Sequence, residues 1–215
     1  YKTKFKFFVI ILFLILMPLV YSNISFREYK ESYSSYETVQ LEVVIENITL
    51  SRDLAIFNLY LLDQNNVSFA ISKNIVKINN TFYVYYFDLP QLSSGSYFLS
   101  LKEVNYVENG VSKIGEFSTN LNLNENTESV ISVRPAYNFY RLNANQDTAF
   151  TVTLTNKGPS SVNIVLTKDK DFFNFENTNF DLAPAEFKNV PIFIKSEKFD
   201  SSIMKGNIGV EYGSG

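Results

Sequence analysis

The chain has 215 residues, a net charge of −3 at neutral pH, and neither histidine nor cysteine. Without these two residue types it lacks the commonest general base, the thiol nucleophile, the usual zinc ligands and any disulfide. Its 46% of hydrophobic residues, with 20 Phe and 14 Tyr, excludes a disordered stalk and indicates packed cores.

The N-terminus has the pattern of a secretory signal peptide. Three lysines within residues 1–6 precede an apolar run from Phe7 to Val20 that is interrupted only at Pro18. At 1.5 Å per residue this run covers roughly 21 Å, less than the ~30 Å hydrocarbon core that a spanning helix must cross. We therefore expect a hydrophobic helix in residues 1–22 that is cleaved after Ser22, with an uncleaved membrane anchor as the alternative.

Removal of this leader changes the net charge from −3 to −6, because residues 1–22 contain three lysines and no acidic residue. No basic stripe remains to neutralise phosphates, so the composition disfavours nucleic acid as a partner. A contact with the membrane is expected only through an uncleaved leader. The predicted location is outside the cytoplasm, at the cell surface, in the envelope or secreted.

Residues 23–126 show the period-two alternation of β-strands. Val39, Leu41, Val43 and Ile45 alternate with mostly polar residues, which is typical of a strand with one face in a core. Asn109-Gly110 between two such runs predicts a type I′ hairpin. Further strands are predicted at residues 55–62, 67–72, 74–78, 82–89 and 97–104.

A polar segment around Asn126 separates this region from residues 127–215, where the strand pattern begins again. Alternation over 150–154 and again over 162–166, joined by the turn residues 156–160, predicts a hairpin. Other strand-like runs are 130–133, 172–175, 180–182, 190–194 and 206–212. The pattern therefore predicts an all-β chain of two tandem antiparallel β-sandwiches.

The second region resembles a known class of module. Its Leu154-Thr-Asn-Lys-Gly158 turn, Phe172-Phe173 segment, Leu182-Ala-Pro184 element and late Gly206–Val210 strand are similar to immunoglobulin-like modules of prokaryotic surface proteins, of the PapD-like and ASH-type groups. The resemblance covers residues 129–212, and it implies a spacer or adhesion module without an active site. Residues 23–126 resemble such modules in strand pattern only.

The sequence contains no G-x-S-x-G elbow, phosphate-binding loop or dinucleotide fingerprint, so neither an enzyme nor a cofactor is expected. A pair of carboxylates far apart in the chain stays open as the basis of a small secreted hydrolase. The turns 63–66 and 169–171 are acidic or rich in amides, but neither supplies the six to eight oxygens that calcium requires. We expect both to be solvated turns and predict no metal site.

Four Asn-x-Ser/Thr sequons occur, all in the first region, and each is a possible glycosylation site in an exported protein. They begin at Asn23, Asn47, Asn66 and Asn79. Asn66 and Asn79 fall in predicted turns, where a glycan has room.

The strand Phe82–Leu89 is aromatic or apolar on both faces. In a two-layer sandwich one face of a strand meets the core, so the other exposes aromatic groups of the kind enriched at binding surfaces. The first interpretation is cross-strand packing in an aromatic-rich sheet, and the alternative is that Tyr83, Tyr85 and Tyr86 form a candidate patch for other surface proteins or glycans. The function expected is that of a surface or envelope adhesion protein. Its rival is the accessory region of an exported hydrolase whose catalytic domain lies beyond residue 215.

Overall fold

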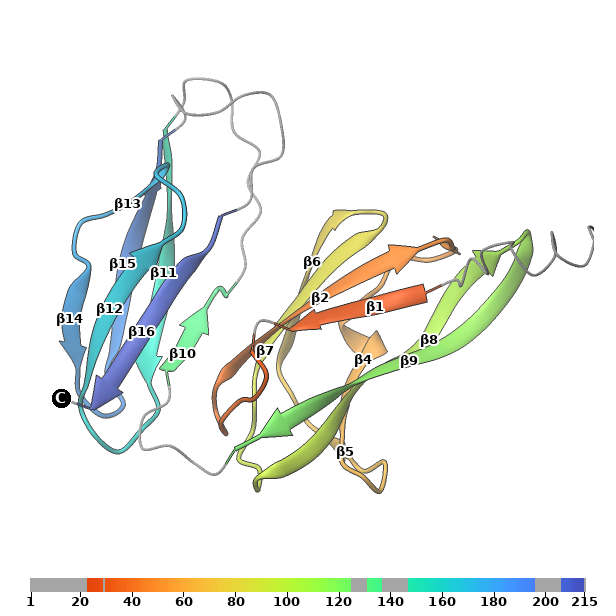
Figure 1. Cartoon of the computed structure of the whole chain (residues 1–215), viewed down its shortest axis with the longest axis horizontal. Helices are drawn as coiled ribbons and strands as arrows, with labels where there is room; N and C mark the ends of the chain where they lie inside the picture. Colours follow the sequence, from red (N-terminus) through yellow and green to blue (C-terminus); the bar gives the residue numbers. More distant parts are fainter. Residues whose placement is uncertain (1–22, 29, 125–130, 137–146, 196–205, 215) are drawn as a thin grey trace, which may run out of the picture.

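The computed structural model describes residues 23–28, 30–124, 131–136, 147–195 and 206–214. These residues form antiparallel β-sheets and one 3₁₀ helix, η1 (Ile56–Asn58), so the prediction of an all-β chain of antiparallel strands is confirmed (Figure 1). No helix in these ranges has the length and apolarity to cross a bilayer. The predicted leader helix (1–22) and the predicted boundary at Asn126 lie outside the described residues.

The first unit contains two sheets. The first sheet has, in spatial order, β1 (Asn23–Glu28), β2 (Thr38–Glu46), β7 (Phe82–Asp88) and β6 (Lys73–Asn79). The alternation predicted for residues 39–45 is present. The four side chains buried on the inner face of β2 are Val39, Leu41, Val43 and Ile45.

The second sheet of this unit is built on a long hairpin. Its strands are β3 (Thr49–Leu50), β8 (Gly95–Glu108), β4 (Leu59–Leu62) and β5 (Ser68–Phe69), and β9 (Val111–Leu123) pairs with β8.

The turn between β8 and β9 confirms the predicted hairpin. Asn109 and Gly110 both have positive φ, 50° and 79°, as a type I′ turn requires. Farther along β8 the register shifts between Leu101 and Val104, where Glu103 has a φ of 55°. This bulge changes which residues of β8 face the core.

One hydrophobic cluster joins the two sheets of the first unit. Tyr83, Tyr85 and Phe87 of β7 contribute from one sheet, and Leu59 and Leu101 contribute from the other; all five are 0–1% exposed. The sheets therefore form two layers around one core, which is the arrangement expected when each sheet has one apolar face.

The second unit repeats this arrangement with a separate hydrophobic cluster, whose members run from Ile131 to Ile194. One sheet has the order β10 (Ile131–Arg134), β11 (Thr148–Asn156), β15 (Phe187–Ile194), β13 (Phe173–Phe175). The other has the order β14 (Asn179–Leu182), β12 (Val162–Lys168), β16 (Ile208–Ser214).

The hairpin predicted between residues 150–154 and 162–166 is wrong. Strand β11 pairs with β10 and β15, whereas β12 pairs with β14 and β16 in the opposite sheet. The buried Asn156 side chain causes this crossing: its Nδ2 donates to the carbonyls of Ser160 (2.8 Å) and Leu182 (3.0 Å), and its Oδ1 accepts from the Gly158 amide (2.9 Å). These bonds direct the chain from one layer to the other.

A group of polar contacts centred on Asp88 connects the two units, and we call it the Asp88 clasp. Asp88 closes β7 and accepts hydrogen bonds from the Thr38 hydroxyl (2.6 Å), the Ser132 hydroxyl (2.9 Å) and Arg134 Nη2 (2.6 Å). The Val133 amide also donates to Thr38 Oγ1 (3.0 Å). Strand β10 of the second unit is thereby held against the ends of β2 and β7 (Figure 1).

Candidate binding surface

Of the two interpretations of the aromatic strand, cross-strand packing is correct for Tyr83 and Tyr85, and the alternative of a surface patch is wrong for these two. Tyr83 and Tyr85 are completely buried on the inner face of β7, so they are removed from any exposed patch, and cross-strand packing is their role. Tyr86 is half-buried on the outer face, opposite Gln40 of β2 and Asn74 of β6. These two tyrosines cannot form a surface patch because they share with Phe87 the face of β7 that points into the core, whereas Tyr86 lies on the opposite face.

The two buried tyrosines nevertheless position a surface loop. Their hydroxyls reach the edge of the core, where Tyr83 donates to Asp53 Oδ1 (2.9 Å) and Tyr85 donates to the Ala55 carbonyl (2.9 Å). These two hydroxyls therefore attach residues 51–58, which follow β3 and end with η1, to the core. We call this segment loop 51–58.

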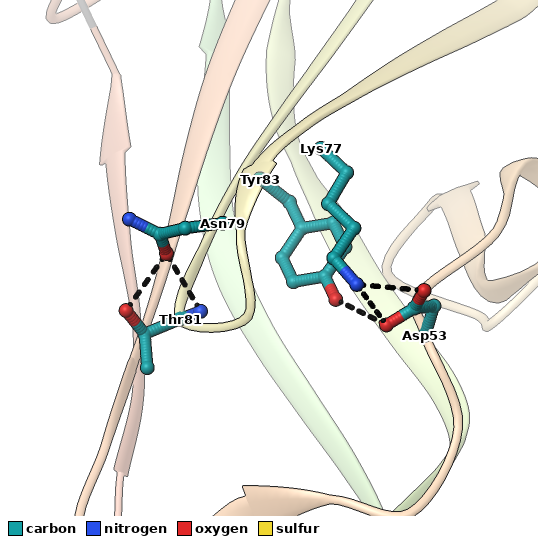
Figure 2. A network of polar contacts seen from close by, with 5 residues as sticks. All are labelled: Asp53, Lys77, Asn79, Thr81 and Tyr83. Carbon is teal, nitrogen blue, oxygen red and sulfur yellow. Dashed lines mark hydrogen bonds and ion pairs between the residues drawn. The ribbon is translucent and has the colours of Figure 1, made fainter. Parts of the chain in front are cut away.

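Asp53 is the main polar anchor of loop 51–58, and Figure 2 shows Lys77 of β6 and Tyr83 converging on its carboxylate. Lys77 Nζ lies 2.7 and 2.8 Å from the two Asp53 oxygens. The hydrogen bonds from Lys77 and then Tyr83 hold the pKa of Asp53 below its usual value. Burial, followed by the bond to Asp53, raises the pKa of Tyr83. The carboxylate is therefore ionised and its charge is balanced locally.

Backbone contacts fix the other side of the loop. The buried Asn58 side chain accepts the Ala55 amide at Oδ1 (2.9 Å) and donates from Nδ2 to the carbonyl of Lys102 (2.9 Å), beside the bulge of β8. The Ser51 amide donates to the carbonyl of Asn105 (2.9 Å). A segment held at so many points loses little conformational freedom on binding a partner.

This loop presents apolar side chains to solvent. Ile56 is 50% exposed and Phe57 is 48% exposed, although both follow the buried Leu54. The Arg52 guanidinium carbon lies 5.3 Å from the centroid of the Phe57 ring, a cation–π arrangement that holds the ring in place. Arg52, Ile56 and Phe57 thus form a small apolar surface with one positive charge, which we call the Phe57 surface.

The sequence analysis missed the Phe57 surface because residues 55–62 were expected to form a single strand. Strand β4 begins only at Leu59, and the residues before it form η1. The sequence feature that could have indicated this turn is Asn58, a polar residue within an apolar run. Its side-chain Oδ1 accepts the Ala55 amide and closes the turn.

The two acidic turns are held by hydrogen bonds of the protein itself. Asp63 Oδ1 accepts the amides of Asn65 and Val67, each at 2.8 Å. Asp169 Oδ1 accepts the Asn207 amide at 2.7 Å. Within the ranges that the structure describes, no three His, Cys, Asp or Glu side chains gather as a metal site would require.

No protein-family model matches the chain, and no curated protein matches its sequence. Solved structures align with it at low similarity. A protein of unknown function from Porphyromonas gingivalis W83 is 12% identical with a TM-score of 0.28, covering 79% of this chain and 83% of that one. The D00-D0 domain of intimin is 14% identical with a TM-score of 0.26, covering 82% and 87%.

A third similar structure is the CsuC–CsuE chaperone–tip adhesion subunit complex of Acinetobacter baumannii, at 11% identity and a TM-score of 0.29, covering 88% and 91%. Because all three TM-scores are below 0.5, none of these structures assigns a function to this chain.

Proposed function

We propose that this chain is a non-catalytic binding module of an exported protein, whose two units are immunoglobulin-like sandwiches and whose Phe57 surface contacts a protein partner. The observation that carries the proposal is the half-exposed Ile56-Phe57 pair on loop 51–58. Aromatic and arginine side chains dominate the energetics of protein interfaces, and a pre-ordered loop offers them at low entropic cost.

The use of the carboxylates supports a non-catalytic role. Asp53, Asp63 and Asp88 each accept hydrogen bonds from neighbouring side chains or amides, and each holds a loop, a turn or a strand end in place. Glu37 pairs with Lys30 and accepts the Ser34 amide (2.9 Å). Each of these carboxylates is thus engaged in hydrogen bonds or an ion pair that stabilise the fold.

Site-specific photo-crosslinking tests the Phe57 surface. A photoreactive phenylalanine analogue is placed at position 57, or at position 187 as the matched control, since Phe187 in β15 is 64% exposed. On the cells that produce the protein, we expect position 57 to crosslink to one partner and give a discrete adduct. Purified wild-type chain, added as a competitor, should suppress that adduct. As a competitor, the Phe57→Ser variant should require a concentration about 30-fold higher for the same suppression. Truncation of an interface hot spot costs about 2 kcal/mol of binding free energy.

Equal adducts from positions 57 and 187, or equal suppression by wild type and Phe57→Ser, would show that the Phe57 surface has no partner. Export is tested separately by mass spectrometry of the released chain. The expected N-terminus is Asn23, whereas an intact leader in the membrane fraction would establish the anchored form.

A further inference from the structure

The four sequons differ in how the folded chain presents them. In the first two, the middle residue is part of the core: Ile24 is 3% exposed and Ile48 is 9% exposed. A glycosyl-transferring enzyme must surround the acceptor segment, and it cannot do so where the central side chain is packed between two sheets. The sequons at Asn23 and Asn47 are therefore poor acceptors once the chain has folded.

The sequon Asn79-Asn80-Thr81 is presented differently. All three residues are exposed: Asn79 ends β6, and Asn80 and Thr81 form the turn that leads to β7. Asn79 Oδ1 accepts two hydrogen bonds from Thr81, one from its amide (2.8 Å) and one from its hydroxyl (2.9 Å). Figure 2 shows that the Asn79 Nδ2 atom lies on the side of the amide away from Thr81.

This geometry suits transfer of a sugar to nitrogen. The Nδ2 atom would bond to the anomeric carbon of a sugar carried on a lipid-linked pyrophosphate, while the bond from that carbon to the phosphate oxygen breaks. The pyrophosphate leaves with the electron pair, and Nδ2 loses one proton to a basic group of the transferase or to water. As that proton leaves, negative charge develops on Oδ1, where the two Thr81 donors are already aimed and stabilise it.

We propose that Asn79 is an N-glycosylation site of the folded protein. This inference rests on the proposed export, because the donor and its transferase act outside the cytoplasm. Asn66 is the matched comparison, since Asn66, Val67 and Ser68 are also exposed. However, the backbone of that sequon is tied to Asp63, whose amide donates to the Val67 carbonyl (3.0 Å) and whose Oδ1 accepts the Val67 amide (2.8 Å).

The test uses the purified, folded full chain, a single-subunit oligosaccharyltransferase and its lipid-pyrophosphate-linked oligosaccharide, with an acceptor peptide as the control for enzyme activity. Peptide mass spectrometry should find the glycan on Asn79. Thr81→Val should lower the initial rate at Asn79 about tenfold or more, as loss of a donor to a developing charge does, and Thr81→Ser should restore it. Asn66→Gln should leave modification of Asn79 unchanged.

The heat-denatured chain provides the second arm, because unfolding frees Ile24 and Ile48 and should open the sequons at Asn23 and Asn47 to modification. The proposal is overturned if the enzyme modifies the peptide but not Asn79 of the folded chain, or modifies Thr81→Val as fast as wild type. It is also overturned if folded and denatured chains are modified alike at Asn23 and Asn47. Crosslinking from position 57 is measured separately, so failure here leaves the Phe57 surface standing.

Discussion

Tyr83 and Tyr85 show how a single side chain serves both the core and the surface. Each ring fills the first core, while its hydroxyl reaches loop 51–58 at the edge of the layer. Tyrosine suits this position because its body is apolar and its tip forms hydrogen bonds. The aromatic strand, for which the sequence predicted cross-strand packing or a binding patch, therefore packs in the core and supports loop 51–58.

Tyr85→Phe should lower the free energy of unfolding by about 1–2 kcal/mol at neutral pH, because the Ala55 carbonyl loses its buried donor. Burial raises the pKa of Tyr85 in the folded state above the ordinary tyrosine value of about 10. A raised pKa favours the neutral phenol on folding, so this contribution is complete below pH 10 and is lost as the pH rises above it. The wild-type unfolding free energy should therefore fall above about pH 10, and fall less steeply in Tyr85→Phe.

Urea unfolding at pH 7 and at several values above pH 10 measures both effects. Tyr86→Phe is the matched control, because Tyr86 lies in the same strand but only half-buried on the outer face. If the two variants respond alike to pH, Tyr85 does not provide the alkaline sensitivity.

At the level of secondary-structure elements, β11 shows what alternation does and does not determine. Alternation over residues 150–154 predicts that Phe150, Val152 and Leu154 point into the core. This is confirmed, since Val152 and Leu154 are 8% and 1% exposed and the partly buried Phe150 packs against the same core. Thr153 lies on the opposite face, where its hydroxyl donates to Asn189 of β15 (2.8 Å). Alternation therefore predicted the buried face of the strand, but it predicted the wrong neighbouring strand.

Val152→Ala and Leu154→Ala should each lower the free energy of unfolding by about 1–4 kcal/mol, because each removes buried methyl groups and leaves a cavity. Thr153→Ala should cost well under this, since it removes only one hydrogen bond between exposed side chains. Urea midpoints of the three variants give the comparison. A loss at Thr153 as large as that at Leu154 would mean that the core lies on the other face of β11.

On the scale of the whole molecule, two separate hydrophobic clusters are connected by polar contacts. The Asp88 clasp is partly exposed, with Asp88 at 19% and Arg134 at 50% side-chain exposure. An ion pair of this exposure contributes little to stability, typically about 0–1 kcal/mol. Its orientation is restricted, however, because Arg134 Nε (3.1 Å) and Nη2 (2.6 Å) both donate to Asp88 Oδ2. We therefore expect the clasp to fix the angle between the units without making their folding interdependent.

Fragments 23–126 and 127–215 should each unfold cooperatively, because each contains its own core. In the intact chain, Asp88→Asn together with Arg134→Ala should broaden the distribution of distances between spin labels placed one in each unit. The chain contains no cysteine, so two introduced cysteines carry the labels uniquely. Pulsed electron–electron double resonance measures the distribution of distances between the two labels.

Asp169→Asn is the control for the labelling experiment, because Asp169 bonds only within the second unit, to Asn207. An unchanged distribution in the Asp88/Arg134 variant would show that the clasp does not orient the units. If either fragment unfolds without cooperativity, the units depend on their interface for folding, or the boundary does not lie at Asn126.

Features that depend on neighbours along the chain could be predicted from the sequence alone. Period-two alternation located most of the strands and their buried faces, because the pleat sends successive side chains to opposite sides. Asn109-Gly110 predicted its hairpin, because both positions require positive φ.

The pairing of strands and the exposure of individual side chains could be learned only from the folded chain. The crossing at Asn156 depends on the carbonyl of Leu182, 26 residues away, and the anchoring of Asp53 depends on Lys77 and Tyr83. Contacts between distant segments leave no periodic trace in the sequence, because they depend on how the sheets stack and not on local backbone preference. For the same reason the exposure of Phe57 became visible only once loop 51–58 had been placed on the core.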